Sequence, residues 1–75
     1  MTLVEEVRAA RRVPSPAVAR MIRQAAGVSQ VRMARELGVH RITLHRWEAG
    51  ACSPTGELLA RYGELLAALQ REVAE

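Results

Sequence analysis

The chain is 75 residues long, enough for one small domain over residues 1–75, and 49% of its residues are apolar while only 3% are aromatic. Its formal net charge is +3, and its single cysteine, Cys52, excludes an internal disulfide. No apolar run approaches the ~20 residues of a membrane span. We expect no signal peptide, because Glu5 and Glu6 come before any apolar stretch. We therefore expect an aliphatic core, no membrane association, and a cytoplasmic, nucleoid-associated location.

A first helix is expected over residues 2–12. Thr2 is a suitable N-cap, and Glu5 and Glu6 in the first turn complement the helix dipole. Residues spaced three and four apart form one apolar stripe, which consists of Leu3, Val7 and Ala10.

A second helix is expected from Pro16 to about Ala26. Ser15 is a suitable N-cap, and proline is favoured at the first helical position that follows. Its apolar face has helical spacing and is expected in the core; it consists of Val18, Met21, Ile22 and Ala25.

Residues 29–49 predict two short helices around a tight turn. Ser29 is a suitable N-cap for the first, Gly38 falls where the chain leaves it in a left-handed conformation, and Gly50 is a suitable stop for the second. Their apolar spacing predicts a common inner face of Met33, Ala34, Leu37, Val39, Leu44 and Trp47. This helix-turn-helix geometry holds helix 40–49 where it can enter a DNA major groove.

The outer face of helix 40–49 is polar and basic. The sequence has no acidic residue between Gly38 and Trp47. The alternative interpretation, a helical hairpin with a solvated face, would mix acids with bases, whereas a surface facing DNA phosphates avoids acids. We therefore expect a reading surface of His40, Arg41, Ile42, Thr43, His45 and Arg46.

A long helix is expected over residues 54–74. Ser53 is the favoured N-cap, before Pro54, and Thr55 is the alternative. Gly63 marks a bend or a close helix contact, at a cost of ~1 kcal/mol relative to alanine. Apolar residues recur along the whole helix at three- and four-residue steps: Leu58, Leu59, Tyr62, Leu65, Leu66, Leu69 and Val73.

The second half of this helix has more apolar residues than a small core needs. Two roles are open for the last four of them, Leu65, Leu66, Leu69 and Val73. They cover the N-terminal helix, or they form a dimer surface. Both roles apply if the two terminal helices build the interface together. We favour the dimer surface, because small cores are marginally stable and dimerisation is a common remedy.

Charge is distributed unevenly along the chain. Residues 1–50 contain nine Arg and four Glu, a net charge of +5, whereas residues 51–75 contain two Arg and four Glu, a net charge of −2. This asymmetry indicates a DNA-binding part and a separate surface for protein contact.

From Arg20 to about Leu69, the chain resembles the phage-repressor helix-turn-helix family (Cro/cI-like, XRE-type). The resemblance is carried by Ser29-Gln30, Ala34, Leu37-Gly38-Val39, Leu44, Arg46-Trp47-Glu48, Gly50 and Ser53-Pro54. It implies an all-α fold, a small five-helix bundle of the phage-repressor DNA-binding type with an extra N-terminal helix and an extended C-terminal helix. It also implies that Gln30 touches the phosphate backbone and braces its neighbours, and that the early positions of helix 40–49 read bases.

The reading residues have different expected roles. Arg41 is expected to bind guanine O6 and N7 in a bidentate manner. Ile42 is apolar, whereas relatives often have Gln, Ser, Asn or Thr at the reading positions. It either packs on a thymine methyl or is partly buried. Arg46 and His45 reach a base or a phosphate, with phosphate favoured for Arg46. Gln30, Arg32 and Thr43 are expected to position the protein on the backbone. Arg20 and Arg23 either touch the flanking backbone or are merely solvated.

These features predict a sequence-specific transcriptional regulator, a phage or bacterial repressor that binds a palindromic double-stranded DNA operator as a homodimer. Two alternatives stay open: an antitoxin or adaptor whose main partner is a protein, and a phage recombination factor that binds and bends DNA. We expect no enzyme activity, cofactor or metal. The sequence has no nucleophile–base pair or glycine-rich phosphate loop, and His40 and His45 are not at a metal-ligand spacing.

Overall fold

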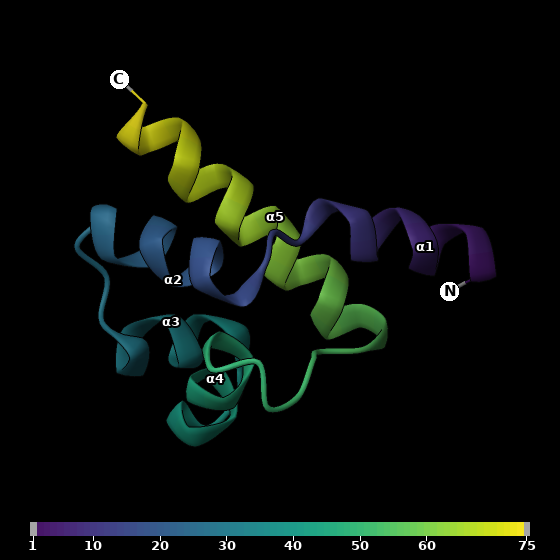
Figure 1. Ribbon diagram of the computed structural model, residues 1–75, viewed down its shortest axis with the longest axis horizontal. Helices are drawn as coiled ribbons and strands as arrows, with labels where there is room; N and C mark the ends of the chain where they lie inside the picture. The colour runs from purple at the N-terminus through teal and green to yellow at the C-terminus, as the bar shows by residue number, and fades with distance from the viewer. Residues whose placement is uncertain (1, 75) are drawn as a thin grey trace.

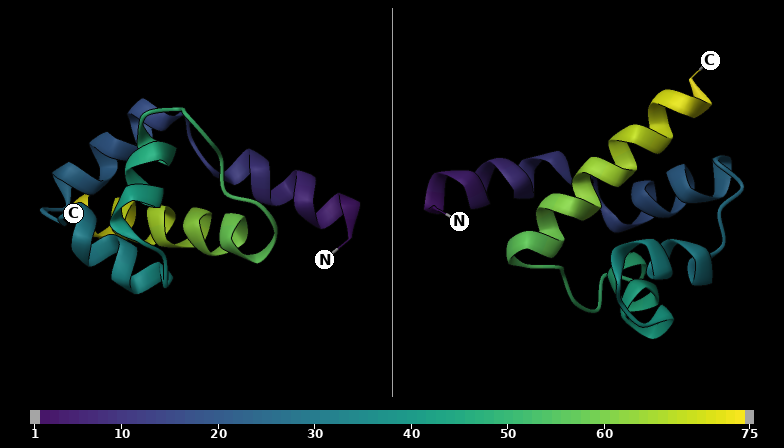
Figure 2. Two further views of the ribbon diagram at one scale, coloured as in Figure 1. Left: turned by 90° about the horizontal axis from the view of Figure 1, so that it is seen from below. Right: turned by 180° about the vertical axis from the view of Figure 1, so that it is seen from behind.

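The computed structural model describes residues 2–74, so residues 1 and 75 of the expected domain lie outside the description. The described residues form five α-helices and no β-strand: α1 (Leu3–Arg12), α2 (Pro16–Ala25), α3 (Gln30–Leu37), α4 (Arg41–Glu48) and α5 (Gly56–Val73). Helices α2, α3 and α4 pack together beside α5, whereas α1 extends away from α2, α3 and α4 (Figures 1 and 2). The predicted all-α fold, with an N-terminal helix and a long C-terminal helix, is confirmed. Within residues 2–74, no helix has the length and apolar character needed to cross a membrane.

Side-chain caps fix the starts of α1, α2 and α3, as predicted. The hydroxyls of Thr2, Ser15 and Ser29 each accept a hydrogen bond from the backbone N–H three residues further on, at 3.2, 3.4 and 3.1 Å. The start of α5 differs from the favoured prediction. Pro54 is buried in the preceding loop, and the backbone stays extended through Thr55, which is the N-cap without a side-chain cap bond. The predicted helix 54–74 is therefore α5 over 56–73.

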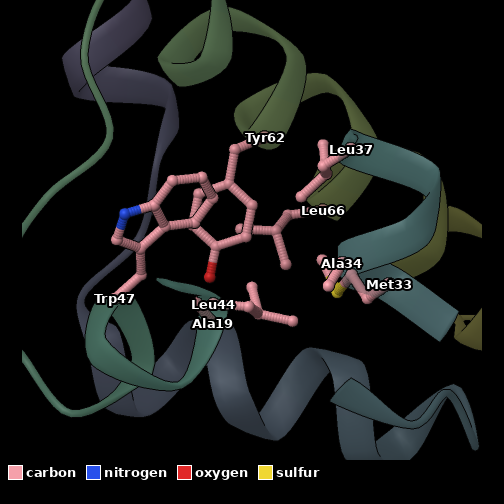
Figure 3. Packing of buried hydrophobic residues seen from close by; sticks show 8 residues of the cluster. All are labelled: Ala19, Met33, Ala34, Leu37, Leu44, Trp47, Tyr62 and Leu66. Atoms are coloured by element: carbon pink, nitrogen blue, oxygen red, sulfur yellow. The ribbon is translucent and has the colours of Figure 1, made fainter. Parts of the chain in front are cut away.

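The predicted inner face of the helix-turn-helix lies at the centre of the core. Met33, Ala34, Leu37 and Leu44 are at most 2% exposed, and Trp47 is 5% exposed. Val39 is half-buried against them, and Ala19, Tyr62 and Leu66 complete the cluster (Figure 3). This part of the core was predicted correctly from spacing alone.

Tyr62 links α5 to α4. Its ring lies 5.0 Å from that of Trp47 between centroids, at an interplanar angle of 46°. Burial, together with the nearby charge of Glu48, raises the pKa of Tyr62 to about 12, although the charge of Arg23 acts in the opposite direction. The hydroxyl therefore stays protonated at neutral pH. It is buried, and it has no hydrogen-bond partner among the described residues.

Helix α2 presents a different face to the core from the one predicted. Val18 and Met21 are 43% and 65% exposed, and Ala25 is exposed as well. The buried residues are Ala19 and Arg23, with Ile22 half-buried beside the core. A small side chain at Ala19 permits close approach to the core, and Arg23 finds a buried acidic partner there. These two requirements outweigh the burial of Val18 and Met21.

The apolar stripe predicted on α1 points away from the fold. Leu3 and Val7 are 74% and 45% exposed, and the neighbouring Val4 is 59% exposed. Ala10 is exposed too, and Ala9 is the buried residue of the helix. The stripe exists, but in this chain it does not contribute to the core.

Gly63 marks a close helix contact, one of the two roles predicted for it. A Cβ atom at this position would lie 3.4 Å from Cβ of Arg12 and 3.4 Å from Cγ2 of Val13. Helix α1 contacts α5 and no other described helix, so Gly63 lies at its main attachment.

The predicted dimer residues on α5 separate into three environments. Leu66 is 1% exposed and part of the core, which excludes it from any surface that a second copy can contact, a correction to the prediction. Leu65 and Leu69 are half-buried against the core, and Val73 is 45% exposed. The alternative, that these residues cover α1, is wrong for Val73. Val73 lies across a hollow from α2, whereas α1 attaches near Gly63.

Candidate nucleic-acid interface

The turn between α3 and α4 is fixed by backbone geometry. Gly38 adopts the left-handed conformation, with φ 71°, which costs a residue with a Cβ atom free energy. The N–H groups of Gly38 and Val39 donate to the carbonyls at the end of α3, at 3.2 Å to Arg35 and 3.0 Å to Ala34. Helix α4 then starts three residues after Gly38, so the turn sets the angle at which α4 is presented.

His40 is the N-cap of α4 and was missed in that role. Its Nδ1 atom accepts a hydrogen bond from the backbone N–H of Ile42 at 3.1 Å. In the neutral imidazole the proton then resides on Nε2, which remains a donor. Histidine is an unusual N-cap, so its place just before the helix was the one available signal for this role.

The remaining predicted reading residues lie on the outer side of α4. Arg41, Ile42, His45 and Arg46 are exposed, whereas Thr43 is half-buried. Ile42 is 43% exposed, which favours the predicted surface role over burial. Arg32 on α3 is exposed and pairs with Glu36 at 2.9 Å, an exposed pair one turn apart. Such pairs are worth only about 0.3–0.5 kcal/mol, so Arg32 stays available to a stronger anion.

Gln30 connects the exposed face to the interior. Its Oε1 atom accepts a long hydrogen bond from Nη1 of Arg41, at 3.4 Å, and its Nε2 donates to Oε1 of Glu48 at 3.1 Å. Gln30 therefore braces its neighbours, as the resemblance implied.

Arg23 and Glu48 form a buried ion pair behind Gln30. Nε and Nη2 of Arg23 donate to the two carboxylate oxygens of Glu48 at 2.6 and 2.9 Å, and Nη1 donates to the carbonyl of Val28 at 2.8 Å. The two side chains are 9% and 2% exposed. The proposed backbone or solvated role of Arg23 is therefore wrong.

The charge state of Glu48 follows from its neighbours. Burial alone would raise the pKa of Glu48, but hydrogen bonds from Arg23 and Gln30, with the charges of Arg23 and Arg20, outweigh burial and lower it. Glu48 is therefore an anion at neutral pH, and Arg23 balances its charge.

A hollow of about 380 Å³ lies where α2, α3 and α4 meet. It is lined by Arg20, Arg23, Gln30, Arg41, His45, Glu48 and Ala49. Because Arg23 and Glu48 balance each other, the exposed arginines Arg20 and Arg41 leave the hollow with a net positive charge. This charge and the Gln30 amide make the hollow suitable for an anion such as a phosphodiester.

The sequence did contain a signal for the missed ion pair. Glu48 follows Leu44 by four residues, so it shares the inner face of α4. A carboxylate on an inner face requires a buried cation, and Arg23 follows Ala19 by four residues on α2. Spacing alone did not identify Ala19 and Arg23 as the inner face of α2.

Comparison with known proteins agrees with this geometry. Residues 17–75 match the family model described as a helix-turn-helix domain, a range that runs from the second residue of α2 through α5 and leaves α1 outside. No curated protein and no solved structure matches the chain. The match covers more than half of the chain and confirms the resemblance inferred from residues 20–69. The chain therefore belongs to the Cro/cI-like helix-turn-helix family of DNA-binding domains.

Proposed function

We propose that the protein is a sequence-specific transcriptional regulator, a phage or bacterial repressor that inserts α4 into the major groove. The observation that carries this proposal is the outer side of α4, where Arg41, His45 and Arg46 are exposed. The acid within α4, Glu48, is buried and paired. DNA phosphates attract such a surface, whereas an exposed carboxylate would repel them.

Arg41 is the proposed base-reading residue. It is the first residue of α4, and one of its five N–H donors is used by Gln30. Two others can donate in parallel to O6 and N7 of guanine. The exposure of Ile42 supports a neighbouring contact with a thymine methyl.

The positive hollow is the proposed phosphate site. A phosphodiester there would meet the guanidinium group of Arg20 and the second N–H of the Gln30 amide. His45 also lines the hollow. The remaining proposed positioning residues, which set register without reading sequence, are Arg32, His40, Thr43 and Arg46.

The test of the DNA-binding proposal is selection of bound sequences from a random double-stranded DNA pool, followed by titration of the selected site at fixed salt. We expect Arg41→Ala to lose about 1–3 kcal/mol of binding free energy and to relax selectivity at one base pair. The matched control is Arg71→Ala, which removes the same charge from an exposed position on α5. Full, selective binding by Arg41→Ala would overturn the assignment of Arg41, and a pool without enrichment would overturn sequence-specific binding.

We also propose that the protein acts as a homodimer on a palindromic operator, with half-sites about one helical turn, ~34 Å, apart. The supporting observation is an exposed apolar surface around Val73, one of the predicted interface residues. Val73, Val18 and Met21 are 45%, 43% and 65% exposed around a hollow of about 300 Å³ between α2 and α5. Contiguous exposed apolar surface of this kind marks protein contacts.

Sedimentation at high micromolar concentration, with and without DNA, tests the homodimer. We expect a dimer for the wild type and a monomer for Met21→Gln. Leu3→Gln on α1 is the matched control for added polarity and should sediment as the wild type does. A wild type that is monomeric under both conditions would contradict the homodimer.

A specific observation also supports the alternative of a protein partner. The exposed stripe of Leu3, Val4 and Val7 belongs to α1, which lies outside the family match. An antitoxin or adaptor would use such a helix to bind another protein. Isolation of the native protein in a stoichiometric complex, with the complex lost in Val7→Gln and no DNA retained, would favour this function over the repressor.

A further inference from the structure

A continuous path of hydrogen bonds leads from the buried ion pair to the proposed base-reading residue. It runs from Arg23 to Glu48 at 2.6 and 2.9 Å, from Gln30 to Glu48 at 3.1 Å, and from Arg41 to Gln30 at 3.4 Å. We infer that Glu48 is a positioning residue for Arg41, which it holds in place through the amide of Gln30. This inference rests on the proposed reading role of Arg41 and goes beyond it, because Glu48 is buried and does not touch DNA itself.

The chemistry of the two ends fixes the direction of the Gln30 amide. An ionised carboxylate can only accept hydrogen bonds, and a guanidinium can only donate them. Between Glu48 and Arg41, the amide therefore satisfies both neighbours in one orientation, with its NH2 group toward Glu48 and its carbonyl toward Arg41. The lowered pKa of Glu48 keeps the carboxylate ionised at neutral pH and so maintains this orientation.

Burial makes Glu48 a fixed anchor for the amide. Its side chain is 2% exposed, and Arg23 holds both of its oxygens in a bidentate pair. Arg23 is itself tied to the carbonyl of Val28 at 2.8 Å. The anchor thus spans α2 and α4, and Gln30 extends it to the outer surface.

The expected consequence is preorganisation of Arg41. An exposed arginine has many rotamers, and binding a base restricts them at a cost in conformational entropy. A carbonyl held beside Nη1 removes part of that freedom before DNA arrives, while the other donors stay available. Without a fixed Glu48 acceptor, the Gln30 amide can rotate and present its NH2 group to Arg41, where two donors face each other.

The inference is tested by a double-mutant cycle on the selected DNA site, with Glu48→Gln, Arg41→Ala and the double variant. If Glu48 acts through Arg41, Glu48→Gln weakens wild-type binding roughly fivefold more than it weakens Arg41→Ala binding, and it relaxes selectivity at the same base pair. A role limited to stability predicts equal effects in both backgrounds and unchanged selectivity, which would overturn the inference. The control is Glu64→Gln, which raises the net charge by one at an exposed position on α5.

A second variant keeps the test decisive if Glu48→Gln does not fold. Gln30→Met preserves the shape of a half-buried surface side chain and breaks the path at its middle. The double-mutant cycle of Gln30→Met with Arg41→Ala should show a similar coupling factor. Any phosphate contact that Gln30 loses weakens binding equally in both backgrounds and does not enter this factor. Additive effects of Gln30→Met and Arg41→Ala would contradict the path.

A measurement without DNA separates this inference from the proposed function. In the free protein, NMR signals of the Gln30 side-chain amide should be displaced from exposed-glutamine values and should move toward them in Glu48→Gln. An unperturbed Gln30 amide in the wild type would overturn the inference while leaving the reading role intact. If Arg41→Ala keeps full selectivity but the Gln30 amide is displaced, the reading role fails and the hydrogen-bonded path stands.

Discussion

Helices α1 and α4 are both short and amphipathic, yet they turn their apolar residues in opposite directions. In α4, Leu44 and Trp47 are buried and the basic residues face outward. In α1, Leu3 and Val7 are exposed, and the small Ala9 makes the contact with the fold. Apolar spacing therefore identifies a helix and its stripe, but the residues available to cover that stripe determine where it points.

The largest expected difference between the two regions is in stability. Trp47→Ala should cost about 3–5 kcal/mol, because it removes a buried aromatic side chain and its contact with Tyr62. Leu3→Ala should change the free energy of unfolding by less than about 0.5 kcal/mol, since Leu3 is mostly exposed. Urea denaturation followed by circular dichroism measures both. A comparable loss for Leu3→Ala would show that α1 has a buried partner.

Acid should weaken the α2–α4 attachment through Glu48. Its pKa is lowered in the folded state, so its contribution to stability is present above the unfolded pKa near 4.5 and is lost as pH falls through the folded pKa. Wild-type protein should therefore lose more stability between pH 7 and pH 3 than Glu48→Gln does. Urea midpoints at the two pH values measure this, with Glu64→Gln as the control, and equal losses for wild type and Glu48→Gln would contradict it.

Substitution by alanine should change stability differently at Gly38 and at Gly63, and these changes are the smallest of those predicted. Gly38→Ala should cost about 1–2 kcal/mol, because its φ of 71° is left-handed. Gly63→Ala should change stability by less than about 1 kcal/mol, because the gain in helix propensity is set against close contact with Arg12 and Val13. Thermal melting of both variants makes the comparison. A larger loss for Gly63→Ala would show that the α1–α5 contact tolerates no added atom.

The helix-turn-helix was predictable because local rules agreed there. A capping serine at Ser29, a left-handed glycine at Gly38 and apolar residues at fixed offsets all specify one geometry. The exposed outer side of α4 follows from that geometry, since the residues left over after Leu44 and Trp47 are buried must face outward.

Other features depended on contacts between distant residues. The face of α2 is set by the pairing of Arg23 with Glu48, 25 positions apart, and this overrides the apolar spacing of Val18 and Met21. Helix α5 starts at Gly56, after a loop in which Pro54 is buried. Neither follows from a local pattern, because each depends on which partner the rest of the fold supplies.

The most direct test of the central claim, that the outer side of α4 reads DNA, is an NMR titration of the isotope-labelled protein with the selected DNA site. We predict that the largest chemical-shift changes occur at residues 40–46 and at Gln30, with little change at residues 3–9 of α1. Changes concentrated on α1, with those of α4 small, would contradict the claim.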